Sequence, residues 1–256
     1  YERIAYSRMI HRIAQERHAK RILELDATYI AGIPGFNSCL LAMQGYDVTI
    51  TVNPRDYTDA VHAWRILGLY PGPYENVVIL EDDGNLQLPH KGYDIVWNHL
   101  AFEHYREPTT LVNKMAELSN DVVLNLTLAP YNLGFIIHWI NHTWKHKKWD
   151  HGQLRQMTIG AVQRSHHKVG LREIESDACD IPPWMDTVDA KVGGSMTYLD
   201  GYPKWIRDRW IWCSADPSTI DRNLVKWFWH MEQRLPKWFR VLVGHHLYVV
   251  STVKEQ

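Results

Sequence analysis

Histidines recur at one-turn spacing in the middle of the chain. His138, His142 and His146 are four residues apart, and Asp150 and His151 follow them. On an α-helix this spacing puts the imidazoles on one face, where a neighbouring pair and a carboxylate could hold a metal ion. One ion could not bind all three, because the row spans about 12 Å on a straight helix. The favoured interpretation is a polar helix face or the rim of a substrate cleft, so no metal is expected.

Residues 21–54 have the pattern of a strand, a turn with glycines, a helix and a second strand. Gly32 and Gly35 stand in the turn, and a helical stretch over 36–44 separates it from the alternating run at 46–52. Such a βαβ unit brings a backbone turn and a helix N-terminus to the carboxyl edge of a parallel sheet. Cofactors that contain adenine bind at this edge, so the segment predicts a cofactor site.

Apolar runs alternate with helical patterns beyond this unit. Strands are expected at about 20–26, 46–52, 76–80, 93–97, 121–127, 171–176 and 246–252, and helices at 1–19, 35–44, 55–67 and 107–118. Asp56 or Thr58 is expected to cap the helix over 55–67. The alternation indicates an α/β fold, an open sheet with helices on both faces.

The chain is expected to form a single domain over 1–256. An N-terminal helix (1–19) precedes a cofactor-binding half (20–127) and a substrate-side half (128–256). Two stretches, at about 130–165 and 181–240, are longer than simple crossovers require. They are expected to be insertions that form the acceptor site.

Composition excludes several classes of protein. The 28 basic and 29 acidic side chains give a net charge of −1, so no nucleic-acid partner is expected. No apolar run reaches the roughly 20 residues of a membrane span, and no membrane partner is expected. Three scattered cysteines and the absence of a signal-peptide pattern favour a cytoplasmic location. The twelve tryptophans favour a large aromatic core over a deep apolar pocket.

Four motifs stand in order between residues 20 and 127. They are Ile22-Leu23-Glu24-Leu25, Gly45-Tyr46-Asp47-Val48-Thr49, Gly92-Tyr93-Asp94-Ile95-Val96-Trp97, and Phe102-Glu103-His104-Tyr105 before Glu107-Pro108. Together they resemble class I S-adenosylmethionine-dependent methyltransferases of the small-molecule type. The resemblance implies a Rossmann-like, doubly wound, mostly parallel seven-stranded sheet with an antiparallel last strand and helical insertions. It also implies S-adenosylmethionine as the cofactor.

The resemblance assigns roles to individual residues. It implies that the acid in the first strand helps to fix the glycine turn, and that acids after the third strand accept from the adenine amine. The implied cofactor-binding residues are Glu24, Asp26, Gly32, Gly35, Asn53, Asp82, Asp83 and Asn98. A neutral histidine near the sulfonium could act as general base, and the candidates by placement are His99, His104 and His151.

Two features depart from the family pattern. Where the family has a GxGxG run, this chain has a longer turn in which Thr28 and Tyr29 would crowd the ligand unless the loop takes another path. Asn53 ends the second strand, where the family usually has an acid that accepts from both ribose hydroxyls. A neutral amide is a weaker acceptor, so the affinity is expected to fall by about tenfold without being abolished.

The sequence therefore predicts methyl transfer from S-adenosylmethionine to a small-molecule acceptor. The acceptor is expected under segments 130–151 and 181–215, and its identity and target atom stay open. The alternative is an inactive, methyltransferase-like binding or scaffold protein, in which the altered turn and Asn53 reflect lost cofactor affinity. A nucleotide-sugar or dinucleotide enzyme is a weaker third possibility, because the GxGxxG motif is missing.

Overall fold

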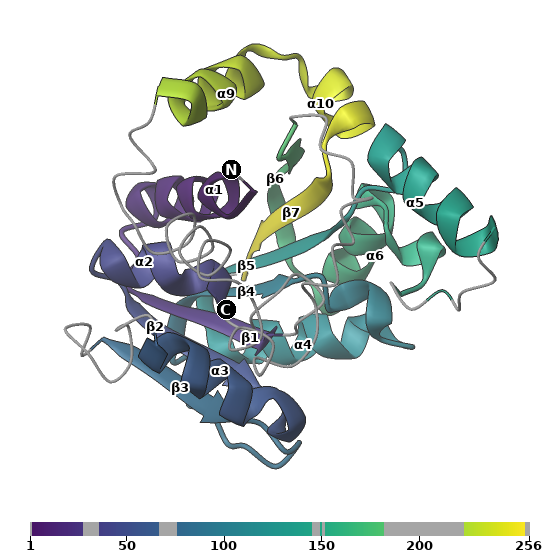
Figure 1. Ribbon diagram of the computed structural model, residues 1–256. Helices are drawn as coiled ribbons and strands as arrows, with labels where there is room; N and C mark the ends of the chain where they lie inside the picture. The colour runs from purple at the N-terminus through teal and green to yellow at the C-terminus, as the bar shows by residue number, and fades with distance from the viewer. Residues whose placement is uncertain are drawn as a thin grey trace.

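A seven-stranded sheet forms the centre of the computed structural model, which describes residues 2–27, 36–66, 76–144, 149, 152–181 and 223–253 (Figure 1). The strands are β1 (Arg21–Ala27), β2 (Asp47–Val52), β3 (Val77–Glu81), β4 (Tyr93–His99), β5 (Ser119–Leu128), β6 (Arg172–Cys179) and β7 (His246–Thr252). Their order is β3-β2-β1-β4-β5-β7-β6. Strand β7 runs antiparallel to both of its neighbours, and the other pairs are parallel. The predicted mostly parallel sheet with an antiparallel last strand is confirmed.

Helices cover both faces of the sheet (Figure 1). The α-helices are α1 (Glu2–Glu16), α2 (Cys39–Met43), α3 (Pro54–Ile66), α4 (Pro108–Leu118), α5 (Leu133–Trp144), α6 (Ile159–Val169), α9 (Asn223–Arg234) and α10 (Lys237–Val243). Short 3-10 helices are η2 (Phe36–Ser38), η3 (Phe102–His104) and η4 (Leu154–Gln156). The helix expected at 35–44 is thus a 3-10 turn followed by a short α-helix.

The central strands are apolar on both sides because both faces are covered. In β1, Ile22 packs in a core with α1, α2 and α3, whereas Leu23 and Leu25 pack in a second core with α4 and α6. This alternation explains why the strand is a nearly continuous apolar run. The division into two halves with two insertions stays a prediction, because most of 181–240 lies outside the described residues.

Ion pairs join α1 to strands β5 and β6 of the sheet. The Arg12 guanidinium donates to both carboxylate oxygens of Glu175 on β6, at 2.6 and 2.9 Å, and the Tyr248 hydroxyl donates to the same carboxylate at 2.6 Å. At the other end of the helix, Arg17 Nε donates to Asp121 at 2.7 Å. These contacts join the first element of the chain to its last strands.

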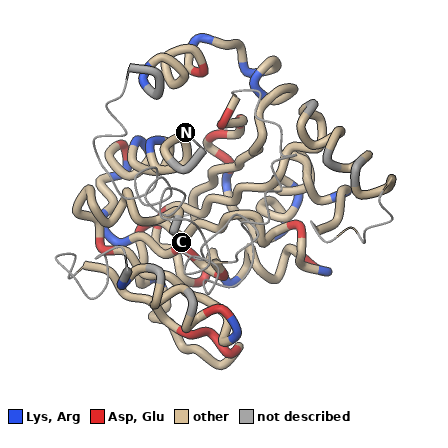
Figure 2. The backbone as a smooth tube through the Cα atoms, in the orientation of Figure 1, with Lys and Arg blue, Asp and Glu red and all other residues tan. Residues whose placement is uncertain are grey.

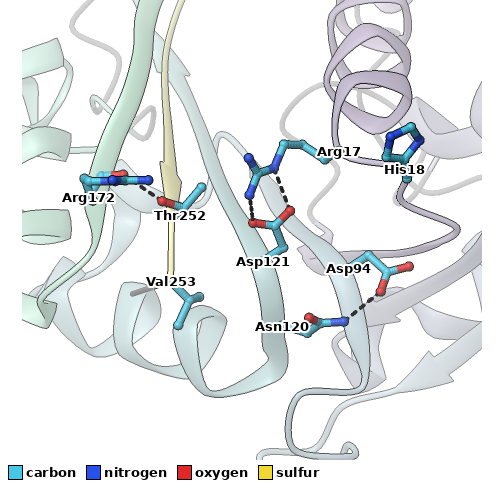
Figure 3. A pocket seen from close by; sticks show the side chains of 8 residues that line it. All are labelled: Arg17, His18, Asp94, Asn120, Asp121, Arg172, Thr252 and Val253. Carbon is cyan, nitrogen blue, oxygen red and sulfur yellow. Dashed lines mark hydrogen bonds and ion pairs between the residues drawn. The ribbon is translucent and has the colours of Figure 1, made fainter. Parts of the chain in front are cut away.

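A polar pocket of about 780 Å³ lies at the amino edge of the sheet, where α1 ends (Figure 3). The Arg17–Asp121 ion pair crosses it, and the Asp94 carboxylate accepts from the N–H groups of Lys20 and Arg21 at 2.8 and 2.9 Å. Burial opposes ionisation of Asp94, but the hydrogen bonds from Arg21 and Lys20 outweigh it and lower the pKa of this carboxyl. Ligands of open α/β sheets bind at the carboxyl edge, so we interpret these contacts as structural.

A neutral histidine lies in the core between α6 and the sheet. Helix α6 begins where the Thr158 hydroxyl accepts the N–H of Ala161 at 3.1 Å, a normal N-cap. From this helix His166 reaches Ser251 with Nδ1 (2.7 Å) and the Asn125 amide oxygen with Nε2 (2.8 Å). Burial lowers the pKa of His166 to about 3. Its Nε2 therefore donates and its Nδ1 accepts the hydroxyl proton.

We expect this histidine to make the protein less stable in acid. The neutral form is favoured in the folded state, so stability is fully present above the unfolded pKa and is lost as pH falls below it. Between pH 7 and pH 5 the free energy of unfolding should decrease by about 2 kcal/mol through His166. Urea denaturation at the two pH values should show this decrease in the wild type, and His166→Gln should lack it.

The matched control is His167→Gln, because His167 is the exposed neighbour on the same helix. It should keep the wild-type dependence on pH. A His166→Gln variant whose stability still falls as steeply as that of the wild type would contradict the assignment of a neutral, buried imidazole.

Candidate active site

Polar residues gather at the carboxyl edge of the sheet. The parallel register of β1, β2, β3 and β4 brings the ends of these strands together. Six of the predicted site residues lie at or just beyond these ends: Asp26, Asn53, Asp82, Asp83, Asn98 and His99. Gly32, Gly35 and His151 lie outside the described residues, as do Thr28 and Tyr29 of the first turn, so the expected crowding there is untested.

Glu24 is buried on β1 and anchors the segment that follows the turn. The Ser38 hydroxyl donates to its carboxylate at 2.5 Å. Burial raises the pKa of Glu24 to about 7, although the hydroxyl and N–H of Ser38 act in the opposite direction. The contact fixes the start of α2 against the central strand. The glycine turn lies outside the described residues, so both the role of Glu24 in fixing it and a contact with the cofactor stay predictions.

Asp26 turns the chain at the end of β1. Its φ angle is +55°, a left-handed conformation that few non-glycine residues adopt. Its N–H donates to the Thr51 hydroxyl at 2.8 Å, and its carboxylate accepts the Tyr105 hydroxyl at 2.7 Å. Burial and the nearby Asp26 carboxylate raise the pKa of Tyr105. The tyrosine therefore stays a donor and holds the carboxylate at the edge of the sheet.

Asn53 caps α3 in place of the predicted Asp56 or Thr58. Its side-chain oxygen accepts the Asp56 N–H at 3.2 Å, and its amide nitrogen donates to the Asp56 carboxylate at 2.7 Å. We call this reciprocal pair the capping box, although the Asn53 side-chain amide stands in for the backbone N–H that donates in the usual motif. The expected caps were wrong because the helix begins at Pro54. The box also explains the departure from the family pattern, since an aspartate at position 53 could not donate to Asp56.

The two acids after β3 differ in their surroundings. Asp82 accepts the Lys114 ammonium at 2.8 Å and the Gly84 N–H at 2.9 Å. Asp83 is exposed, and hydrogen bonds from Asn85 lower the pKa of its carboxyl. Asp83 is therefore the more accessible acceptor of the two, and its predicted contact with an adenine amine stays a prediction.

Asn98 is completely buried at the end of β4. Its amide nitrogen donates to the Leu25 carbonyl at 2.6 Å, and its oxygen accepts the Ala101 N–H at 3.2 Å. Both polar atoms thus bind backbone groups. The geometry favours a positioning role for this side chain at the edge between β1 and β4, whereas the predicted contact near a sulfonium is not tested.

His99 belongs to a buried aromatic cluster that the sequence did not reveal. The Asn37 amide donates to its Nδ1 at 3.1 Å, and its ring centroid lies 4.6 Å from that of Tyr6 and 5.5 Å from that of His246. The Tyr6 hydroxyl lies 3.2 Å from the ring nitrogens of His246. The sequence predicts His246 as the start of a strand, which is confirmed. Because that strand is antiparallel, its first residue lies at the carboxyl edge of the sheet. The predicted reversal of the last strand was the sequence feature that could have placed His246 beside His99.

The loop after β4 contains a second buried acid. His104 is exposed, whereas its neighbour Glu103 is buried and accepts the Leu128 N–H at 3.2 Å. Burial raises the pKa of Glu103 to about 7. The carboxyl joins this loop to the end of β5, and a general-base role for His104 stays a prediction.

The histidine row is described only in part. His142 is buried with its ring edge-on to Trp149, which in turn packs on Phe135. His146 and the side chain of His138 lie outside the described residues. Within the described ranges, no group of three metal-binding side chains occurs. The metal hypothesis for the complete row therefore remains untested.

Comparisons place this architecture among solved structures. No family model matches the sequence, and no curated protein matches it. The YcgJ protein of Bacillus subtilis is 15% identical, with 98% of each chain covered and a TM-score of 0.51. A putative sarcosine dimethylglycine methyltransferase from Galdieria sulphuraria is 14% identical, with 98% of this chain and 83% of that chain covered and a TM-score of 0.51. The 4+2 cyclase SpnF is 11% identical, with 96% and 80% covered and a TM-score of 0.53.

The chain has the class I methyltransferase fold. The resemblance predicted from the motifs is confirmed at this level. At 11–15% identity the comparisons establish the fold alone. The 4+2 cyclase SpnF has a similar fold, so the fold alone does not determine the reaction.

The capping box gives a prediction about stability. Asn53→Asp removes the donor to Asp56 and puts two carboxylates side by side, so the free energy of unfolding should decrease by about 1–3 kcal/mol. Adding Asp56→Asn restores a donor and an acceptor in exchanged positions, and most of the loss should be recovered. Chemical denaturation of the wild type, both single variants and the double variant measures the coupling. An Asn53→Asp protein as stable as the wild type would show that the box contributes nothing.

Proposed function

We propose that this protein transfers a methyl group from S-adenosylmethionine to a small-molecule acceptor. The observation that carries the proposal is the row of acceptors at the ends of β1, β2 and β3, in a fold shared with a putative methyltransferase. Ribose hydroxyls and the adenine amine are donors, and they need acceptors spaced along one edge.

The described residues fit the adenosine part of the cofactor. Asp26 and Asn53 are only partly buried, and Asp83 is exposed, so each keeps acceptor capacity beside its present contacts. An amide oxygen has two lone pairs, so Asn53 can accept a ribose hydroxyl while it caps α3. These residues would hold the adenosine, and S-adenosylmethionine, when bound, supplies an electrophilic methyl group on a sulfonium.

The aromatic cluster would serve the acceptor side. Tyr6, His99 and His246 are almost completely buried, so this part of the site excludes water. Donation from Asn37 to Nδ1 of His99 fixes the orientation of this ring within the cluster. The Tyr6 hydroxyl can take a proton from the acceptor as its own proton passes to His246. Methyl transfer otherwise needs positioning more than an elaborate catalytic apparatus.

A binding or scaffold role without catalysis is the second candidate. Two contacts favour it: Asn53 is hydrogen-bonded to Asp56 in the capping box, and Asp82 is paired with Lys114. Both contacts stabilise the fold without a ligand. Cofactor binding distinguishes the two candidates.

Calorimetric titration with S-adenosylhomocysteine tests the proposal. The wild type should bind more tightly than about 100 μM, with a matching thermal stabilisation. Asp83→Ala removes an acceptor and should weaken binding by about tenfold. Asp47→Ala is the matched control, because Asp47 is an exposed acid at the amino end of β2, and it should bind like the wild type. Absence of binding at millimolar ligand would favour the scaffold.

The exchanged capping box provides an independent prediction about affinity. Asn53→Asp combined with Asp56→Asn places a carboxylate at the end of β2, where it should accept charge-assisted hydrogen bonds from the ribose. Binding of S-adenosylhomocysteine should tighten by about tenfold relative to the wild type. Unchanged or weaker binding by a folded double variant would argue against ribose recognition at position 53.

A further inference from the structure

Helix α5 is apolar on the face that it turns to solvent. Ile136, Trp139, Ile140 and Trp144 are 42%, 45%, 47% and 81% exposed, and their spacing places them along one stripe. Phe135, on the inner side of the helix, is buried. An amphipathic surface helix turns its polar side outward, and a helix that is apolar all round is normally enclosed. This stripe therefore requires a partner or an apolar medium.

The stripe continues into neighbouring apolar surface. A groove of about 430 Å³ beside it is lined mainly by apolar side chains, among them Tyr131, Trp139 and Leu154. At the start of α5, Asn132 donates to the Gly244 carbonyl at 3.5 Å, which links this helix to the end of α10. On α10, Trp238 and Leu242 are 69% and 51% exposed. The name Trp band is used below for Ile136, Trp139, Ile140 and Trp144 of α5 with Trp238 and Leu242 of α10.

The charge around the Trp band is positive. The described part of 130–168 contains three cations, Arg155, Arg164 and Lys168, and no acid, although the whole chain has a net charge of −1. Arg155 lines the groove and Lys237 on α10 is exposed, whereas Arg240 on α10 is paired with Asp177 of β6. Figure 2 shows acidic residues gathered instead around the end of β3, at the bottom of the view.

We propose that the Trp band binds the surface of a membrane that contains anionic lipids. Tryptophan prefers the bilayer interface, aliphatic side chains enter the acyl region, and nearby cations attract anionic headgroups. A symmetric contact with a second copy would place like charges opposite each other, which disfavours it. The protruding Trp144 suits a deformable medium better than a preformed protein pocket.

Interfacial binding needs no membrane span. No helix within the described residues is long and apolar enough to cross a bilayer. The expectation of no membrane partner rests on the lack of a long apolar run, which excludes a membrane span but not binding at the surface. A helix that lies in the interface uses one apolar face of ordinary length. The proposal does not depend on the proposed methyl transfer.

Vesicle flotation with the full chain tests this proposal. The wild type should float with vesicles of phosphatidylcholine that contain about 30 mol% phosphatidylglycerol, and less with pure phosphatidylcholine. Ile140→Glu places a charge in the Trp band and should reduce the partition coefficient by about tenfold. Ile174→Glu is the matched control, because Ile174 is 45% exposed on β6, outside the band, and this variant should bind like the wild type.

Circular dichroism and thermal denaturation of both variants establish that they are folded. The proposal is overturned if the wild type does not float, if it floats equally with neutral vesicles, or if folded Ile140→Glu floats as well as the wild type. It is also overturned if light scattering shows a dimer that Ile140→Glu dissociates, because the band would then be an interface between copies. Titration with S-adenosylhomocysteine on the same samples separates these outcomes from a failure of the proposed function.

Discussion

The buried Asn98 amide holds the two central strands together at the edge where the candidate site lies. It binds a carbonyl of β1 with one atom and an N–H of the turn after β4 with the other. The pairing of β1 with β4 ends here, so the Leu25 carbonyl and the Ala101 N–H need another partner. A buried backbone group without a hydrogen bond would decrease stability. The constraint fixes the relative positions of Asp26 and His99, the residues next to these bonds. The geometry of the site therefore depends on a side chain that is completely buried.

Structure and binding make competing demands on the residues along this edge. Asn53 caps α3 through Asp56, and Asp82 holds Lys114, so the acceptors that would face an adenosine also stabilise the strand ends. A change from Asn53 to the usual acid should thus decrease the stability of the fold, because the new carboxylate would lie beside that of Asp56 whether or not a ligand is bound. Asn53, the residue that departs from the expected pattern, thus has a structural contact of its own with Asp56.

The sequence predicted the sheet well because its evidence is local. Each strand is an apolar run bounded by turn residues, and the order of motifs from Glu24 to Glu103 fixed the topology through a resemblance. It did not predict the capping box, because Asn53 and Asp56 each look like ordinary cap residues. It also missed the Tyr6–His246 contact, which joins residues 240 positions apart. Such contacts depend on tertiary packing, which periodicity does not encode.

The most direct test of the account is a crystal structure of the chain with S-adenosylhomocysteine. We expect the adenosine to lie along the carboxyl ends of β1, β2 and β3, with a ribose hydroxyl in hydrogen-bond distance of Asn53 and the sulfur directed towards His99. A ligand bound at the amino edge, or a carboxyl edge filled by protein side chains with no room for an adenosyl group, would contradict it.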